Sequence, residues 1–149
     1  MKSHFLNLCQ YEYWANQKVY ESTLQLPEIP ERANELLSHI LAAQNIWYSR
    51  LAGIPEKFKV WEKIPSEKWL ETLKENTTKL YDFVNNLTES RFSDRITYKN
   101  SQGDAFDTAI QDVLSHLLLH STYHRGQIII LIKPFTNTVF ASDYIFYHY

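Results

Sequence analysis

The chain has little of several features that would point to particular classes of protein. Glycine (3) and proline (5) are scarce among its 149 residues, so long loops and disordered stretches are not expected. Basic charge is not in excess, because 15 Lys and Arg stand against 17 Asp and Glu, and this disfavours nucleic-acid binding. The single cysteine, Cys9, excludes an internal disulfide, and its simplest interpretation is a small buried apolar residue.

Long hydrophobic runs are also missing. Polar residues such as His4, Asn7 and Gln10 interrupt the first stretch, so a signal peptide is not expected. The most apolar segment, about residues 110–132, carries Asp112, Arg125 and three histidines, which makes it a poor membrane span. We therefore expect a cytoplasmic protein with no membrane partner, folded as one domain over residues 1–149, since this length suits a single core.

Four stretches of the chain show helical periodicity. The first covers about residues 3–25, where Phe5, Leu8, Tyr11, Ala15 and Val19 recur at steps of three and four. The second runs from Pro30 to a stop at Gly53, the third begins at Ser66 as a cap, and the fourth covers about residues 108–133, with Thr108 or Asp107 as its cap. The turn-forming "NSQG" between the third and fourth predicts a short β-hairpin. The sequence thus predicts an all-α fold, a four-helix bundle with a hairpin between helices 3 and 4.

Three of the six histidines lie in one apolar segment, "HLLLHSTYHRGQ", residues 116–127. On a helical wheel at about 100° per residue with His120 at zero, His124 falls at about 40°, inside the apolar arc, and His120 lies at its border. His116 falls at about −40°, toward the polar side, and is about 12 Å from His124 along the axis, too far for all three to share one ion. The i, i+4 pair His120 and His124 can converge on one metal ion.

A third ligand has to come from another helix, and His39 lies on the buried face of the second one. A single buried histidine is more often a hydrogen-bonded core residue, and a bundle without metal is one interpretation of this pattern. Three buried imidazoles would each need a partner, however, and one metal ion satisfies all of them. The residues therefore favour a metal site of His39, His120 and His124. His4 and His148 lie near the chain ends and are not expected to be ligands.

The segment "SHLLLHSTYHRGQI" resembles the signature of the DinB/YfiT-like superfamily of metal-binding four-helix bundles, and the likeness covers almost the whole chain. Its specific part is "HxxxHRGQ". The segments "YEYWANQKVYE" and "LLSHILAAQNIWYSRLAG" are similar to the family's first-helix and second-helix motifs, "ITYKNSQGDAF" to its hairpin and "VFASDYIFYHY" to its C-terminal stretch. The resemblance implies a metal triad at His39, His120 and His124, the set that the wheels select independently. Many members have an acidic residue where Gln44 stands here, so no role of that carboxylate is expected.

The resemblance also implies the ion and the type of activity. The family ion is usually nickel or zinc, and members are often dimers. Known relatives transfer bacillithiol, mycothiol or glutathione, or isomerise maleylpyruvate with such a thiol, while many members have no assigned reaction. The expected partners are thus a low-molecular-weight thiol and a small electrophilic substrate. A homodimer is also expected because the first two helices carry more aromatic residues than one bundle interior can face, namely Tyr11, Tyr13, Trp14, Tyr20, Trp47 and Tyr48.

Further residues are candidates for contacts around the ion. Trp14, Trp47 and Tyr123 would supply apolar walls with polar tips, although ordinary core aromatics are the simpler interpretation. Gln127, at about −20° on the wheel, is expected to contact the site or a substrate. His116 is expected to donate a hydrogen bond near the site or to cap carbonyl groups. Arg125 is first expected to be a structural ion-pair partner, and only the resemblance suggests that Asp143 reaches back to these groups.

Beside the bundle without metal, two functions of a metal-binding protein remain open from the sequence. Three histidines leave a coordination position free, as in catalytic zinc sites, which favours a metal-dependent thiol S-transferase. The alternative is a non-catalytic protein in which the ion stabilises the bundle. Hydrolysis of the metalloprotease type is disfavoured, because Ser121 follows His120 where that chemistry needs a glutamate.

Overall fold

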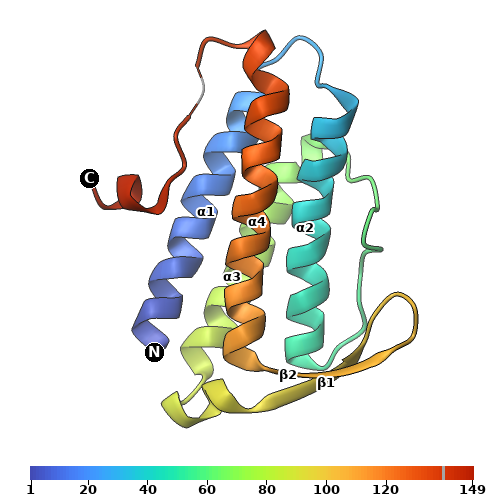
Figure 1. Ribbon diagram of the computed structural model, residues 1–149, viewed down its shortest axis with the longest axis vertical. Coiled ribbons are helices and arrows are strands. Elements are labelled where there is room, and N and C mark those ends of the chain that lie inside the picture. The colour runs from blue at the N-terminus through green and yellow to red at the C-terminus, as the bar shows by residue number, and fades with distance from the viewer. Residues whose placement is uncertain (139) are drawn as a thin grey trace.

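Four long helices form a bundle in the computed structural model, which describes residues 1–138 and 140–149 (Figure 1). They are α1 (Lys2–Leu24), α2 (Glu31–Ala52), α3 (Trp69–Asn86) and α4 (Ile110–Ile132). α1 packs mainly against α3 and α4, and α2 packs against the same two helices, so α1 and α2 lie on one diagonal of the bundle. The predicted all-α four-helix class is confirmed.

The connection between α2 and α3 runs back along α2 from one end of the bundle to the other (Figure 1). It begins at Gly53, which adopts the left-handed conformation (φ 68°) and ends α2 as predicted. Ser38 of α2 then holds the far end, since its hydroxyl bonds both the N–H (3.1 Å) and the carbonyl (3.3 Å) of Ile64. Residues 53–65 are therefore fixed against α2 rather than forming a free loop.

The predicted caps of the last two helices are wrong. Ser66 begins a short 3₁₀ turn, Ser66–Lys68, and no side chain caps α3. Thr108 and Asp107 lie in the second hairpin strand, where they pair with Ile96 and Thr97. Because strand pairing already holds these two residues, α4 begins two residues later than expected, at Ile110.

The hairpin consists of β1 (Arg95–Lys99) and β2 (Ala105–Ala109), paired antiparallel as predicted. In its turn, the Asn100 side-chain oxygen accepts two backbone N–H groups at 2.9 Å each, and Gly103 takes the positive φ of 89°. Tyr98 on β1 packs edge-to-face on Trp47 of α2, with ring centroids 4.9 Å apart. The hairpin thereby covers the C-terminal end of α2.

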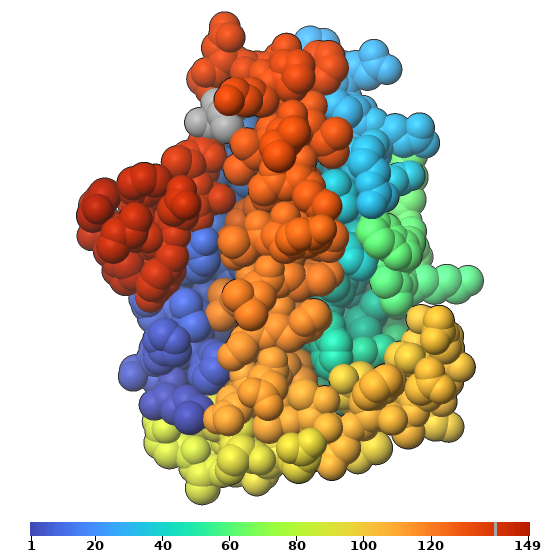
Figure 2. All heavy atoms as spheres, viewed as in Figure 1, coloured from blue at the N-terminus to red at the C-terminus, as the bar shows by residue number. Residues whose placement is uncertain are grey.

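The C-terminal segment after α4 crosses to α1 and packs on its outer side (Figure 2). The Tyr11 hydroxyl donates to the Ser142 carbonyl at 2.7 Å, and Trp14 packs against Phe140 and Tyr147 with centroids 4.9 and 5.6 Å apart. Much of the aromatic surface of α1 is thus covered within the same chain. None of the described helices is both long and apolar enough to cross a membrane.

Candidate metal centre

α2 and α4 bring His39, His120 and His124 together; we call these three residues the His triad. One ring nitrogen from each lies within 4.8 Å of the others. The Nε2 atoms of His39 and His120 are 3.0 Å apart, and the three ring centroids are 4.5–4.9 Å apart. Two nitrogens bound at about 2.1 Å to one ion lie about 3.0–3.4 Å apart for bond angles of about 90–109°. The spacing between His39 and His120 therefore fits two ligands of one divalent ion.

The two helices contribute these residues from different depths. His39 lies on the buried face of α2 and is only 7% exposed. His120 and His124 lie one turn apart on α4 and are half-buried at the edge of the face that enters the core. The site is therefore at the margin of the α2–α4 contact rather than at the centre of the bundle.

Hydrogen bonds fix the orientation of two of the three rings. His39 donates from Nδ1 to the Val60 carbonyl at 2.8 Å, and His124 donates from Nδ1 to the Gln127 side-chain oxygen at 2.7 Å. Both acceptors lack a proton, so each ring carries its own proton on Nδ1 and presents the Nε2 lone pair. Bonds of this kind commonly orient metal-binding histidines. The Nδ1 atom of His120 is buried without a hydrogen-bond partner among the described residues.

The surroundings favour the neutral form of two of the imidazoles, His120 and His39. Burial, reinforced by the neighbouring His124, His39 and His116 rings, lowers the pKa of His120 to about 3. Burial also lowers the pKa of His39, although its hydrogen bond to Val60 acts in the opposite direction. Neutral imidazole is the form that binds metal, so these two ligands need not lose a proton to solvent at pH 7.

Trp61, in the connection between α2 and α3, lies directly on one member of the His triad, His39. Its indole stacks on the His39 imidazole with ring centroids 3.9 Å apart and an interplanar angle of 10°. Neither Trp61 nor Val60 was identified from the sequence, because the connection has no helical or strand periodicity that would assign its residues to a face. Only the path of this connection along α2 brings them to His39.

His116 and Trp47 extend the site toward the hairpin. The His116 ring lies 5.5 Å from that of His120 and 5.2 Å from that of Trp47, and Trp47 in turn contacts Tyr98. Burial lowers the pKa of His116. The His116 ring makes no hydrogen bond in the described part of the chain, so the donor role expected for it is not seen, while Trp47 does lie beside the site.

Three other candidate residues lie away from the interior of the site. Tyr123 is 65% exposed, and its ring meets that of His124 edge-to-face with centroids 5.2 Å apart. It lies one residue before His124, so its side chain is turned about 100° away from that ligand around the helix. Trp14 belongs to the aromatic contacts between α1 and the C-terminal segment and has no ring contact with the His triad. Asp143 is exposed beside Tyr144 in a groove between α1 and α4. The apolar walls expected at Trp14 and Tyr123 are therefore not seen at the His triad, and Asp143 lines this groove instead.

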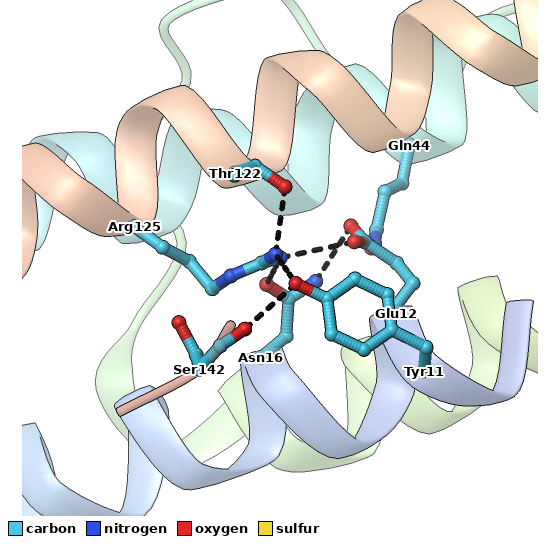
Figure 3. A network of polar contacts seen from close by, with 7 residues as sticks. All are labelled: Tyr11, Glu12, Asn16, Gln44, Thr122, Arg125 and Ser142. Atoms are coloured by element: carbon cyan, nitrogen blue, oxygen red, sulfur yellow. Dashed lines mark hydrogen bonds and ion pairs between the residues drawn. The ribbon is translucent and has the colours of Figure 1, made fainter. Parts of the chain in front are cut away.

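Arg125, next to His124 in the chain, is the centre of a buried polar network (Figure 3). Its side chain is 1% exposed and forms an ion pair with Glu12 of α1 at 3.0 Å. It also donates to Asn16 (2.9 Å), to the Tyr11 hydroxyl (3.0 Å) and to Thr122 (2.9 Å). The Tyr11 hydroxyl in turn donates to the Ser142 carbonyl, which links this network to the C-terminal segment. The predicted ion-pair role of Arg125 is confirmed, and its partner is on α1.

Gln44 completes this network from α2. Its amide Nε2 donates to Glu12 at 3.3 Å, and Asn16 donates to the same carboxylate oxygen at 2.9 Å (Figure 3). An acidic residue at position 44 would place a second carboxylate beside Glu12 in a buried site, which is electrostatically unfavourable. The Gln44 side chain is uncharged and donates a hydrogen bond, so it is compatible with the buried Glu12 carboxylate.

Comparisons with known proteins agree with this architecture. The family model described as the DinB family matches residues 1–149. Protein DinB of Bacillus subtilis (strain 168) is 21% identical in an alignment of 164 positions, which covers 97% of this chain and 93% of that protein. No solved structure matches the chain significantly.

Proposed function

Since the chain belongs to the DinB family, we propose that it binds one divalent metal ion, nickel or zinc, through the Nε2 atoms of the His triad. The convergence of the three rings carries this proposal, because Val60 and Gln127 hold two of them with the Nε2 lone pairs free. All three ligands are nitrogens, which suits zinc and nickel rather than magnesium or calcium.

We further propose a thiol S-transferase activity on small electrophiles. An ion held by three neutral imidazoles keeps its full charge and supplies a position where a low-molecular-weight thiol is stabilised as thiolate. Because His120 and His124 are only half-buried, we expect this ligand to reach the ion from solvent, and the neighbouring Trp47 and Tyr98 rings offer apolar surface for the electrophile. In the reaction the sulfur forms a bond to the electrophilic carbon, the leaving group departs with the bond electrons, and the thiol proton goes to solvent.

A non-catalytic role for the ion is the second candidate. The observation that favours it is the origin of the ligands on two helices, since one ion would link α2 to α4 and stabilise the bundle. The group of candidate ligands found among the described residues contains no carboxylate that could serve as a general base. A metal-activated thiol needs less help from such a base than hydrolysis would.

Two measurements test these proposals. Elemental analysis of protein purified without an affinity tag should find one ion per chain, lost in the Ala variants of His39, His120 and His124 and retained in His116→Ala. If His116→Ala abolished binding while His39→Ala left it intact, the ligand assignment would be wrong. Metal-loaded and metal-stripped protein should then be incubated with glutathione or bacillithiol and a chlorodinitrobenzene or monochlorobimane. Turnover that requires metal and is lost in His124→Ala supports the transferase, whereas equal rates with and without metal favour the structural role.

We also propose that the protein is a cytoplasmic homodimer, although the aromatic residues that suggested it are partly covered by the chain's own C-terminal segment. Large exposed apolar side chains lie instead on the outer side of α4, at Leu119, Tyr123 and Ile130. Apolar side chains grouped on one face favour an interface. Light scattering at micromolar concentration should give about twice the chain mass of 17.7 kDa, and a monomer mass would contradict the dimer.

A further inference from the structure

Trp61 is an exposed tryptophan held in one position beside the His triad. It is 55% exposed, yet its ring lies flat on His39 with centroids 3.9 Å apart. The Arg32 guanidinium, two helical turns before His39 on α2, lies 5.2 Å from the centre of the same indole. The indole is therefore in contact with two side chains of α2, although more than half of its surface faces solvent.

Val60, the residue before Trp61, anchors the His39 ring through its backbone carbonyl. The Val60 carbonyl accepts the His39 Nδ1 proton at 2.8 Å, while the indole covers a face of that imidazole. The hydrogen bond restrains the ring within its plane, and the stack restrains rotation out of that plane. His39 is the only triad member from α2, so its ring orientation decides whether the ligands of α4 and α2 converge.

Metal binding should strengthen the stack. An imidazole bound to a divalent ion is electron-poor, and the indole offers the most favourable aromatic face for a positively charged group. We propose that Trp61 is a positioning residue of the metal centre, whose indole holds the His39 imidazole in the orientation that binds the ion. This inference rests on the proposed metal binding.

The test compares Trp61→Ala and Trp61→Phe with the wild-type protein, using Co²⁺ and Zn²⁺ as probes. Removing contacts that orient a metal ligand costs about 10-fold or more in affinity, so Trp61→Ala should bind at least about 10-fold more weakly, with an altered Co²⁺ absorption spectrum. Trp61→Phe keeps a flat ring and should retain most of the affinity. Trp14→Ala is the matched control, since it removes an indole that does not contact the His triad, and its affinity should be unchanged.

A double-mutant cycle shows whether the effect passes through His39. A His39→Ala variant loses the ion on purification but still offers His120 and His124 to added Co²⁺, and in this background Trp61→Ala should weaken Co²⁺ binding no further. An equal loss in both backgrounds, or wild-type affinity and spectrum in Trp61→Ala, would overturn the positioning role while leaving the metal site intact. Failure of the wild-type protein to bind either ion would overturn the proposed function and this inference together. In metal-free protein, NMR should show the His39 ring protons shifted upfield by the stacked indole, and Trp61→Ala should abolish that shift.

Discussion

The Nε2 atoms of His39 and His120 face each other 3.0 Å apart across the contact between α2 and α4. The Val60 carbonyl keeps the His39 proton on Nδ1, so the proton between the two Nε2 atoms has to belong to His120. In the metal-free protein His120 is then protonated on Nε2, and its buried Nδ1 is left without a partner. The His120 Nε2 atom that carries this proton is also the atom that faces His39, the ligand from α2.

Metal binding is therefore expected to change the tautomer of His120 but not that of His39 or His124. The ion needs the Nε2 lone pair of all three rings, and only His120 has its proton there. Long-range ¹H–¹⁵N NMR spectra of the imidazoles should show His120 moving from the Nε2–H to the Nδ1–H form when Zn²⁺ is added. His39 and His124 should be Nδ1–H forms before and after addition. A His120 ring that is already Nδ1–H without metal would contradict this prediction.

The helices and the His triad were predictable because their signals are local. Apolar residues three and four apart define each helix, and His120 and His124 are one turn apart on the same helix. The partners of these histidines were only half predictable. Gln127 lies on the same helix as His124, whereas Val60 and Trp61 reach His39 through a connection whose path depends on the whole bundle.

The burial of Arg125 on α4 could not be predicted from hydrophobic periodicity. On the wheel the buried face of α4 is centred at about 90°, and Ser121 and Arg125 lie within it at about 100° and 140°. Hydrophobicity alone would place a charged residue outside the core. Arg125 is buried because Glu12, Asn16 and Tyr11 on α1 accept hydrogen bonds from its two terminal nitrogens, and these partners come from more than 100 positions away.

Acidification should destabilise the metal-free protein progressively as the pH falls from about 6.5 toward about 3. The pKa of His120 falls from 6.5 to about 3 on folding, and the pKa values of His39 and His116 are lowered in the same direction. In this window the unfolded chain binds more protons than the folded protein, so the free energy of unfolding decreases as the pH falls. Urea unfolding at pH 7.5 and pH 5.2 measures this difference. The loss should be smaller in His120→Gln, and equal stability of the wild-type protein at both pH values would refute the prediction.

Removing Glu12 should destabilise the protein far more than removing an exposed carboxylate. Glu12→Ala leaves the buried Arg125 without its counter-charge, which costs about 3–5 kcal/mol. The matched control is Glu75→Ala, which breaks the exposed i, i+4 pair with Lys79 and should cost about 0.5 kcal/mol or less. Chemical unfolding at pH 7 measures both. Similar losses for the two variants would mean that the network in Figure 3 contributes little to stability.

Cys9 should be unreactive in the folded protein, so the thiol of the proposed reaction has to come from outside the chain. Burial, with a smaller contribution from the Glu12 charge, raises the pKa of the Cys9 thiol to about 12. At pH 8 only about one molecule in ten thousand would then carry the thiolate, which is the form that reacts. Cys9 is also only partly exposed and lines an apolar cavity of about 30 Å³, which limits the approach of a reagent such as dithionitrobenzoate. Folded protein should therefore leave the reagent unreduced over an hour, while protein unfolded in guanidinium, with a thiol pKa near 8.5, reacts within minutes. Rapid labelling of the folded protein would show that Cys9 is accessible, and Cys9→Ser would then be needed in every assay of thiol transfer.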